Sequence, residues 1–342
     1  MTSSTFSSDD IDREQMAMNR SNLLGCGLFL LMGVVLWLGL QKVSRAHPPR
    51  GWDLILMHRM DTVRTTPESI EILAIGNSHA GAIEPETLER GSLVLPLPWN
   101  DLAEMNYQVH TLAPRLPELR VVLIALSYFT FHWSNDLLED DGLLESRRKF
   151  HAVAPGWGTV EGDLESLVRG KTYWIVRPDD WLGVIQGIRG RDMELDDLEE
   201  HLEEVQTDSF LVSHAEDRIP HTLDQSREMM ELDSTLPEEN YARLAGMIEY
   251  LQERGVCVVL YTPPFHWRYR ELYRPEPSLR EMHRLTRRIE EEQGVPWLDY
   301  SDHSMADEAR WFSDSDHLNT EGRNLLTTLM MGQVEERCPP GS

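Results

Sequence analysis

Two short segments at opposite ends of the chain contain the residue types of a serine nucleophile and its base. Ser78 follows the mostly apolar run 70–75, and His317 lies three residues after Asp314. In nucleophilic acyl transfer a histidine takes the proton of the serine hydroxyl, and a carboxylate holds the imidazole in the required tautomer. The two segments therefore indicate one catalytic site, with Ser78 as nucleophile, His317 as base and Asp314 as the orienting carboxylate.

Each segment also has a purely structural interpretation. Ser78 sits where a strand would end and a helix begin, so its hydroxyl could serve only as a helix cap, and Asn319 or Thr320 could cap the last helix. Asp316 is a rival carboxylate for His317, although adjacent side chains seldom face each other. The same segments can cap helices and also supply catalytic residues, so the two interpretations do not exclude each other.

A metal site is the other chemical alternative, because carboxylates and imidazoles bind several divalent ions. Its ligands would come from Asp302, His303, Asp314, Asp316, His317 and His79. The chain has no helical His-x-x-x-His spacing and no paired-cysteine spacing. We therefore expect neither a metal ion nor another cofactor.

The elements that must bring the two segments together form a predicted parallel sheet. Apolar runs alternate with helical patterns, which is typical of a sheet covered by helices on both faces. The expected strands are Glu71–Ile75, Leu93–Leu95, Arg120–Leu126, Val256–Thr262 and Pro296–Asp299. Ser78 would follow the first strand and His317 the fifth, so both would lie at the carboxyl edge, where open α/β sheets bind ligands.

Start and stop signals place helices between these strands. Asp101 precedes a helix over 102–112, and Pro237 opens one that Gly255 ends. Another helix ends at Gly294, and the last follows Asn319 and is expected to bury leucines 325, 326 and 329 with Met330. Their apolar stripes are predicted core.

An uncharged stretch near the N-terminus, Leu23 to Leu40, predicts a membrane span, because a helix of this length crosses a hydrocarbon core of about 30 Å. It exceeds the roughly 7–15 apolar residues of a cleaved signal peptide, which is the alternative. We expect a disordered tail (1–21), a transmembrane helix (22–41), a juxtamembrane linker (42–69), a catalytic domain (70–335) and a C-terminal tail (336–342).

Residues 134–236 form an expected insertion in the catalytic domain. This acidic segment separates the third and fourth strands by more than a hundred residues, far beyond an ordinary connection. We expect a helical lid or docking surface. A solvated helical excursion without a specific partner is the alternative.

Composition limits the partners of the chain. The formal charge of −26, from 58 acidic and 32 basic residues, repels phosphate backbones and excludes nucleic acid as an expected partner. A solvated acidic shell explains this charge without any specific partner. Three cysteines, Cys26, Cys257 and Cys338, are too few for a disulfide framework and leave the redox compartment undecided.

Three segments resemble the SGNH (GDSL-like) hydrolases. Gly-Asn-Ser-His at 76–79 resembles their Gly-Asp-Ser-Leu block, and Asp-Ser-Asp-His-Leu-Asn at 314–319 resembles their Asp-x-x-His block. Residues 255–266 look like the fourth-strand region of membrane-anchored members. The resemblance spans about 70–330, apart from the insertion. It implies a flavodoxin-like three-layer α/β/α fold around a five-stranded parallel sheet, with Ser78, His317 and Asp314 in the catalytic roles.

The resemblance is weakest at the oxyanion hole. In the family, a glycine of the second block and an asparagine of the third supply donors beside the nucleophile. Here Pro-Trp-Asn-Asp at 98–101 contains no glycine, and the third strand ends in Ala-Leu-Ser-Tyr at 125–128. Ser78 and Asn100 are the expected donors. A lost donor typically lowers the rate by about 10²–10³-fold, so an inactive site or one with a different donor is the alternative.

The resemblance also implies a function and a location. Anchored members resembling the lipoteichoic-acid D-alanylation protein and the alginate O-acetylation proteins act outside the cytoplasm on cell-surface polymers, often beside a multi-pass membrane O-acyltransferase. We therefore expect a single-pass membrane protein with an extracytoplasmic serine esterase or O-acyltransferase domain, acting on acyl esters of a cell-surface polysaccharide or similar polymer. Basic residues flanking the span slightly favour the opposite orientation.

The alternative from a different functional class is a catalytically weak protein of the same fold. Such a protein would bind a polymer or a membrane-bound O-acyltransferase and would not turn over an ester.

Overall fold

The computed structural model describes residues 28, 29, 31–36, 39, 59, 60, 62–88, 90–137 and 206–339. The chain divides into two compact units, residues 1–49 with 172–191 and residues 50–171 with 192–342. The described residues of the first unit are helical. The predicted tail 1–21 and more than half of the predicted membrane helix 22–41 lie outside the described residues. Among the helices that are described, none is long and apolar enough to span a membrane.

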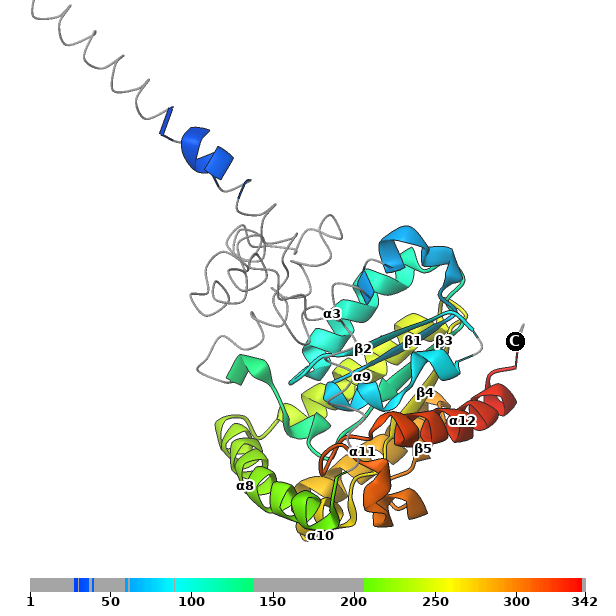
Figure 1. Cartoon of the computed structure of the whole chain (residues 1–342). Coiled ribbons are helices and arrows are strands. Elements are labelled where there is room, and N and C mark those ends of the chain that lie inside the picture. The colour runs from blue at the N-terminus through cyan, green and yellow to red at the C-terminus, as the bar shows by residue number, and fades with distance from the viewer. Residues whose placement is uncertain are drawn as a thin grey trace, which may run out of the picture. The chain divides into compact units, whose positions relative to one another are not determined.

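The second unit is built on a five-stranded parallel sheet in the order β2-β1-β3-β4-β5 (Figure 1). Its strands are β1 (Ile72–Gly76), β2 (Ser92–Pro96), β3 (Val121–Ala125), β4 (Cys257–Thr262) and β5 (Trp297–Asp299). Each lies where an apolar run predicted it, with ends displaced by one residue at most. Every residue of β1 and β3 is buried, which explains why central parallel strands read as continuous apolar runs. Pro96, which lacks an N–H, falls at the end of the edge strand β2.

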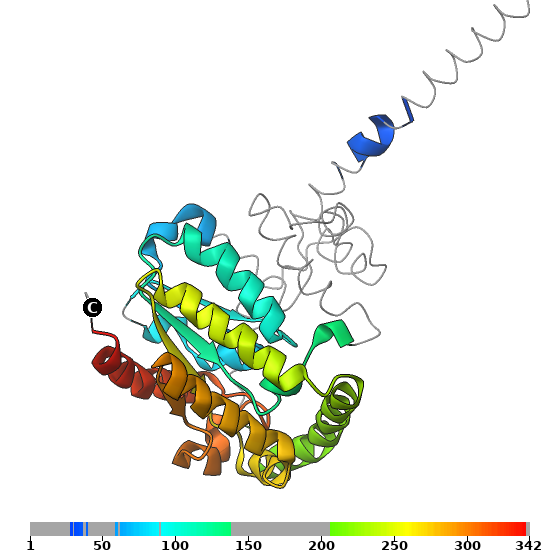
Figure 2. The same ribbon diagram turned by 180° about the vertical axis from the view of Figure 1, so that it is seen from behind.

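Helices cover both faces of this sheet (Figure 2). One face carries α3 (Leu102–Leu112), α9 (Leu236–Gln252) and α11 (Pro277–Gln293). The other carries α12 (Thr320–Arg337) together with short 3-10 turns. The predicted α/β class with a five-stranded parallel sheet is confirmed, and its layers are helix, sheet and helix.

The predicted helix signals act at the expected positions. The carboxylate of Asp101 accepts the Glu104 N–H at 2.8 Å at the start of α3, and the side chain of Asn319 caps α12. Gly294 ends α11 with φ of 66°, in the left-handed region that favours glycine. One core prediction for α12 is wrong, because Leu329 is 37% exposed.

The described end of the expected insertion is a single long helix, α8 (Asp208–Leu232). It packs against α10 (Trp267–Tyr273) and against aromatic residues that follow β3 and β4, including Tyr128 and Phe265. Because parallel strands end at the same edge, α8 lies at the carboxyl edge of the sheet. Residues 138–205 of the insertion lie outside the described residues.

The folded domain begins before the expected boundary at residue 70. Residues 59, 60 and 62–65 are helical, and Met60 and Val63 are buried at 0% and 2% exposure. The 3-10 turn Pro67–Ser69 then leads into β1. Part of the expected juxtamembrane linker is therefore core.

A disulfide joins Cys257, the first residue of β4, to Cys338, the residue that ends α12. The Cα atoms are 5.9 Å apart, and the two residues are 81 positions apart in the sequence. Closing a loop of this length contributes about 4 kcal/mol in the chain-entropy account. The cysteine count alone did not predict this pair.

Candidate active site

The structure brings Ser78, His317 and Asp314 into one hydrogen-bonded chain. The Oγ of Ser78 lies 2.8 Å from Nε2 of His317. The Nδ1 of His317 lies 2.8 Å from Oδ2 and 2.9 Å from Oδ1 of Asp314. With Nδ1–H donated to the carboxylate, the neutral ring presents the Nε2 lone pair to the serine hydroxyl. This is the geometry of a nucleophile, a base and an orienting acid.

Ser78 is positioned by the turn that follows β1. From β1 the chain first adds β2 on one side of β1 and then adds β3 on the other side, so the order of strands switches between β1 and β3. Open α/β sheets bind ligands at such a switch point. A Cβ at Gly76 would lie 2.7 Å from Cβ of Ala125, so only glycine permits this close approach of the two strands. The predicted helix start at Ser78 is a short 3-10 turn, Ser78–Ala82, and the side chain of Asn77, not that of Ser78, caps it.

His317 is positioned by a loop folded around the carboxylate of Asp314. The Oδ1 of Asp314 accepts a hydrogen bond from the backbone N–H of Asp316 at 2.9 Å and another from the backbone N–H of His317 at 2.8 Å. The same oxygen contacts the imidazole, so one side chain fixes both the loop and the ring. Asp316, the rival carboxylate, is 3.9 Å from Nδ1 of His317.

Electrostatics make His317 a strong base. Burial of the ring opposes its charged form, but the negative charges of Asp314 and Asp316 outweigh burial and raise the pKa of His317 to about 9. At neutral pH the imidazolium therefore predominates in the resting site, and roughly 1% of the rings are free base.

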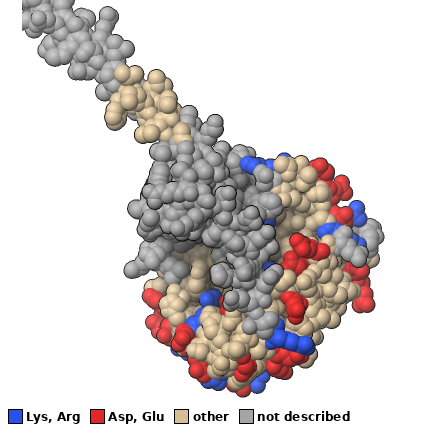
Figure 3. Space-filling view, viewed as in Figure 1, with Lys and Arg blue, Asp and Glu red and all other residues tan. Residues whose placement is uncertain are grey.

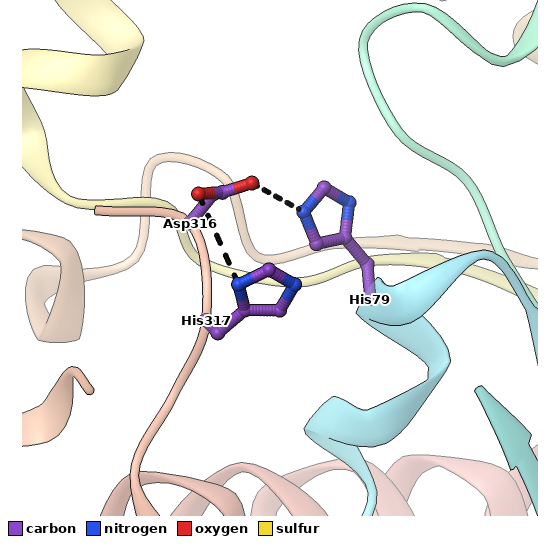
Figure 4. Close-up of side chains that lie close together, drawn as sticks. All are labelled: His79, Asp316 and His317. Carbon is purple, nitrogen blue, oxygen red and sulfur yellow. Dashed lines mark hydrogen bonds and ion pairs between the residues drawn. The ribbon is translucent and has the colours of Figure 1, made fainter. Parts of the chain in front are cut away.

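A second serine, histidine and aspartate chain lies directly behind the first. The Nε2 of His79 is 3.2 Å from Oδ2 of Asp316, and its Nδ1 contacts Oγ of Ser127 at 2.5 Å. Figure 4 shows the Asp316 carboxylate between the rings of His79 and His317. Asn77 donates to Ser127 at 2.7 Å and completes the chain. Sequence reasoning grouped Asp316 and His79 only as possible metal ligands and missed the link through Ser127.

The charges of this second chain are balanced by Arg218 on α8. Its Nε lies 3.1 Å from Oδ2 of Asp316, whose side chain is 1% exposed. Burial favours the neutral acid, but the charge of His317, the hydrogen bond from His79 and the charge of Arg218 hold the pKa of Asp316 far below its usual range. Burial in turn lowers the pKa of His79. Asp316 is therefore a charged carboxylate beside a neutral His79.

The metal alternative gains partial geometric support. Two groups of side chains hold ligand atoms within 4.8 Å of one another: His79, Asp316 and His317, and His214, Asp314 and Asp316. Both groups depend on Asp316, whose carboxylate already faces the guanidinium of Arg218. A divalent cation at either place would meet that positive charge. The arrangement therefore favours a hydrogen-bonded network over a metal centre.

Two of the residues considered for a metal lie elsewhere. Asp302 pairs with Arg270 at 2.7 Å, and the ring of His303 caps the 3-10 turn Ser304–Asp307. Neither lines the cavity that contains Ser78.

A cavity of about 390 Å³ opens onto Ser78 and His317. Its walls come from residues before β1, from β2, from the turns after β1, β2, β3 and β4, from α8, α10 and α12, and from the loop before α12. The lining residues are Arg59, Asn77, Ser78, His79, Gly81, Ala82, Pro96, Pro98, Trp99, Phe129, Arg218, Thr222, Pro263, Tyr269, Ser313, Asp314, Asp316, His317, Leu318 and Arg323. A helical lid or docking surface was expected in residues 134–236, but no residue of α8 was singled out for the site from the sequence.

The structure does not bring Asn100 into the cavity as an oxyanion donor. Its amide nitrogen donates to the Gly76 carbonyl at 3.0 Å and to Oε1 of Gln108 at 3.1 Å, so both amide hydrogens are used. The backbone N–H groups of Ser78 and Trp99, by contrast, have no acceptor among the described residues, and both residues line the cavity. These N–H groups are the better candidates for stabilising an oxyanion.

Trp99 has the backbone conformation of a glycine. Its φ of 61° makes it the one non-glycine residue with positive φ in the described part of the chain. For a bulky side chain this conformation costs on the order of 1–3 kcal/mol, and such strain clusters at functional sites.

No protein-family model matches the chain, and no curated protein sequence matches it. Interpretation of the site therefore depends on its geometry.

Proposed function

We propose that the chain is a serine esterase or O-acyltransferase of the SGNH type that acts on acyl esters of a cell-surface polysaccharide or similar polymer. The observation that carries the proposal is the continuous contact from Ser78 Oγ to His317 Nε2 at 2.8 Å and from His317 Nδ1 to Asp314 at 2.8 Å, on the wall of a cavity. Hydrogen-bond contact from nucleophile to base and from base to orienting carboxylate is the signature of an activated serine.

The first half of the reaction would form an acyl-enzyme. The Oγ of Ser78 attacks the ester carbonyl while Nε2 of His317 takes its proton, and Asp314 stabilises the resulting imidazolium. The negative oxygen of the tetrahedral intermediate would accept hydrogen bonds from the N–H groups of Ser78 and Trp99. The C–O bond then breaks, and His317 returns the proton to the departing alcohol.

The second half would regenerate the serine. His317, neutral again, takes a proton from water or from a saccharide hydroxyl, whose oxygen attacks the acyl carbonyl. Water gives hydrolysis and the saccharide gives O-acyl transfer. Residues of α8 line the cavity, and exclusion of water by this helix would favour transfer.

Two features of the fold support assignment to the SGNH type. The strand order 2-1-3-4-5 is that of flavodoxin-like sheets. Trp99, in the left-handed conformation, stands in the segment where that family has an oxyanion glycine, so its backbone can present an N–H as glycine would.

We further propose an extracytoplasmic location for the domain, behind a membrane anchor at residues 22–41. The Cys257–Cys338 disulfide supports this location, because disulfides persist in oxidising compartments and are rare in the cytoplasm. A multi-pass membrane O-acyltransferase is a partner consistent with this arrangement.

The alternative, a catalytically weak binding protein, is favoured by one observation. Ser127 stands where the family has its third oxyanion donor, and its hydroxyl is buried and engaged with His79 and Asn77. With two donors in place of three, turnover would be about 10²–10³-fold slower.

The test is hydrolysis of p-nitrophenyl acetate by the wild type, Ser78→Ala and the matched control Ser127→Ala. We expect a burst of nitrophenol in the wild type and in Ser127→Ala, and none in Ser78→Ala. Turnover that survives in Ser78→Ala would contradict the assignment of the nucleophile. Absence of turnover in all three proteins would favour the binding protein.

A further inference from the structure

Arg218 presents an unused edge of its guanidinium to the candidate active site. Its Nε is held 3.1 Å from the buried carboxylate of Asp316, and the side chain is 36% exposed on the wall of the cavity that contains Ser78. The two terminal nitrogens have no hydrogen-bond acceptor among the described residues. A guanidinium fixed at Nε and open at its other nitrogens can receive a carboxylate or a similar anion.

The cavity is richer in positive charge than the rest of the chain. Its lining includes three arginines and two aspartates, whereas the whole chain carries a formal charge of −26. Acidic side chains are prominent on the surface shown in Figure 3. Arg59 and Arg323 already have protein partners, the Val94 carbonyl and Glu84 respectively. Arg218 is therefore the lining arginine best able to bind a ligand.

Trp99 forms a braced aromatic platform in the same cavity. Its ring stacks on the buried ring of Trp133, with centroids 4.9 Å apart and planes 22° apart. Asn135 donates to the Trp99 carbonyl at 2.8 Å and accepts from the Trp133 indole at 3.1 Å. Although both its ring and its backbone are held, Trp99 remains 42% exposed. These contacts hold the strained backbone of Trp99 in place while the residue stays partly exposed.

We propose that this cavity binds a saccharide unit that carries an anionic group, with the anion on Arg218 and the sugar ring packed on Trp99. The inference rests on the proposed esterase or acyltransferase function and specifies its substrate class. An indole face is apolar and carries negative charge density, which suits the C–H face of a pyranose ring. The terminal nitrogens of Arg218 bind the anion by charge-assisted hydrogen bonds.

The experiment compares methyl glucuronide and methyl glucoside acetylated at the same ring hydroxyl, which differ only at C6, a carboxylate in the first and a hydroxymethyl group in the second. In the wild type we expect kcat/KM to be about 10- to 100-fold higher for the glucuronide, the range set by charge-assisted hydrogen bonds. Arg218→Gln should bring this ratio close to one. Arg227→Gln removes the same charge from the same helix, at an exposed ion pair with Glu276, and should leave the ratio unchanged.

Two further measurements distinguish the contribution of Trp99 to binding of the sugar ring from the contribution of Arg218 to binding of the carboxylate. Trp99→Ala should raise KM for both esters by a similar factor of about 3 to 10 and leave their ratio unchanged. The wild-type ratio should fall as ionic strength rises, because salt screens the contact with Arg218. This salt dependence tests the inference even if Arg218→Gln does not fold.

Each contrary result has a distinct meaning. Equal cleavage of both esters by the wild type, with turnover abolished in Ser78→Ala, would overturn the inference and leave the proposed function intact. Equal loss on both esters in Arg218→Gln would move Arg218 to the reaction centre and also overturn it.

If neither ester is cleaved, the proposed function fails and calorimetry decides the inference independently. Binding of methyl glucuronide to the wild type, without binding of methyl glucoside, would support it. Equal binding of the two, or binding of neither, would overturn it.

Discussion

Two serine–histidine–aspartate chains lie side by side in this protein, and they differ in what they face. In the first, Ser78, His317 and Asp314 line a cavity, whereas in the second, Ser127, with 0% exposure, bonds to a buried His79. The two imidazole centroids are 5.1 Å apart. Identical residue types with similar contacts therefore form one chain whose serine lines the cavity and one whose serine is fully buried.

The two histidines also have opposite pKa shifts. Burial lowers the pKa of both rings, and in His79 it prevails, whereas the charges of Asp314 and Asp316 raise the pKa of His317 to about 9. The carboxylate of Asp316 also faces the guanidinium of Arg218, so its negative charge interacts with Arg218, His79 and His317 together. The charges around the ring and the position of its serine partner on the cavity, more than residue type, distinguish the candidate base His317 from the structural histidine His79.

The largest expected effect is the contrast between the two serines. Ser78→Ala should lower kcat/KM on p-nitrophenyl acetate by at least about 10³-fold, because it removes the attacking oxygen. Ser127→Ala should lower it by less than about tenfold, while the lost hydrogen bonds to Asn77 and His79 reduce the free energy of unfolding by about 1–3 kcal/mol. Steady-state kinetics and urea unfolding of both variants test this contrast. Similar kinetic losses in the two would show that the chains are not functionally distinct.

The two carboxylates should differ next most strongly. Asp314→Asn removes the charge that orients and stabilises the His317 imidazolium, and should lower kcat by about 10²–10⁴-fold. Asp316→Asn leaves Arg218 without its buried partner, and should mainly lower the free energy of unfolding by about 3–5 kcal/mol. Single-turnover kinetics on folded protein separates the two losses, and a larger rate loss in Asp316→Asn would reverse the assignment of the orienting acid.

The raised pKa of His317 predicts an alkaline rise in activity. Acylation needs the neutral ring, so kcat/KM should increase about tenfold per pH unit below a midpoint near 9. Asp314→Asn removes one of the two negative charges that raise the pKa of His317, so the midpoint should move toward the ordinary histidine value of about 6.5.

Stability should run in the opposite direction with pH. A folded-state pKa above the unfolded one stabilises the protein fully below about pH 6.5, and this contribution is lost as pH rises through 9. Rate profiles and denaturation midpoints between pH 6 and 10 check both trends. A flat rate profile in the wild type would contradict the proposed role of His317.

The smallest expected effect on rate comes from the disulfide. Cys257 begins β4 and therefore lies at the amino edge of the sheet, opposite the candidate site. Replacing both cysteines by serine should lower the free energy of unfolding by about 4 kcal/mol and leave kcat/KM unchanged at a temperature where the protein is folded. A shift in the pH midpoint of this variant would show that the two ends of the sheet are coupled.

Much of the fold was predictable because its signals are local. Continuous apolar runs identified all five strands, and the caps Asp101 and Asn319 marked helix starts. Ser78 and the pair Asp314 and His317 were selected from residue type and spacing, and the parallel sheet explains why they meet.

The rest of the site depends on contacts that no local pattern encodes. The link from His79 to Asp316 joins residues 237 positions apart, and it requires the rotamers of both. Arg218 reaches the cavity because α8 packs on the aromatic residues after β3 and β4. A helical lid or docking surface was expected in residues 134–236, but no local pattern singled out Arg218 or the surface on which α8 packs. Asn100 was expected to face the oxyanion, but its amide is satisfied by Gly76 and Gln108.

The most direct test of the account is intact-mass analysis after reaction with a fluorophosphonate probe, which labels activated serines. We expect one adduct on the wild type, mapped to Ser78, no adduct on Ser78→Ala, and an adduct on Ser127→Ala. An unlabelled, folded wild type, or an adduct that persists in Ser78→Ala, would contradict the claim that Ser78 is the activated nucleophile.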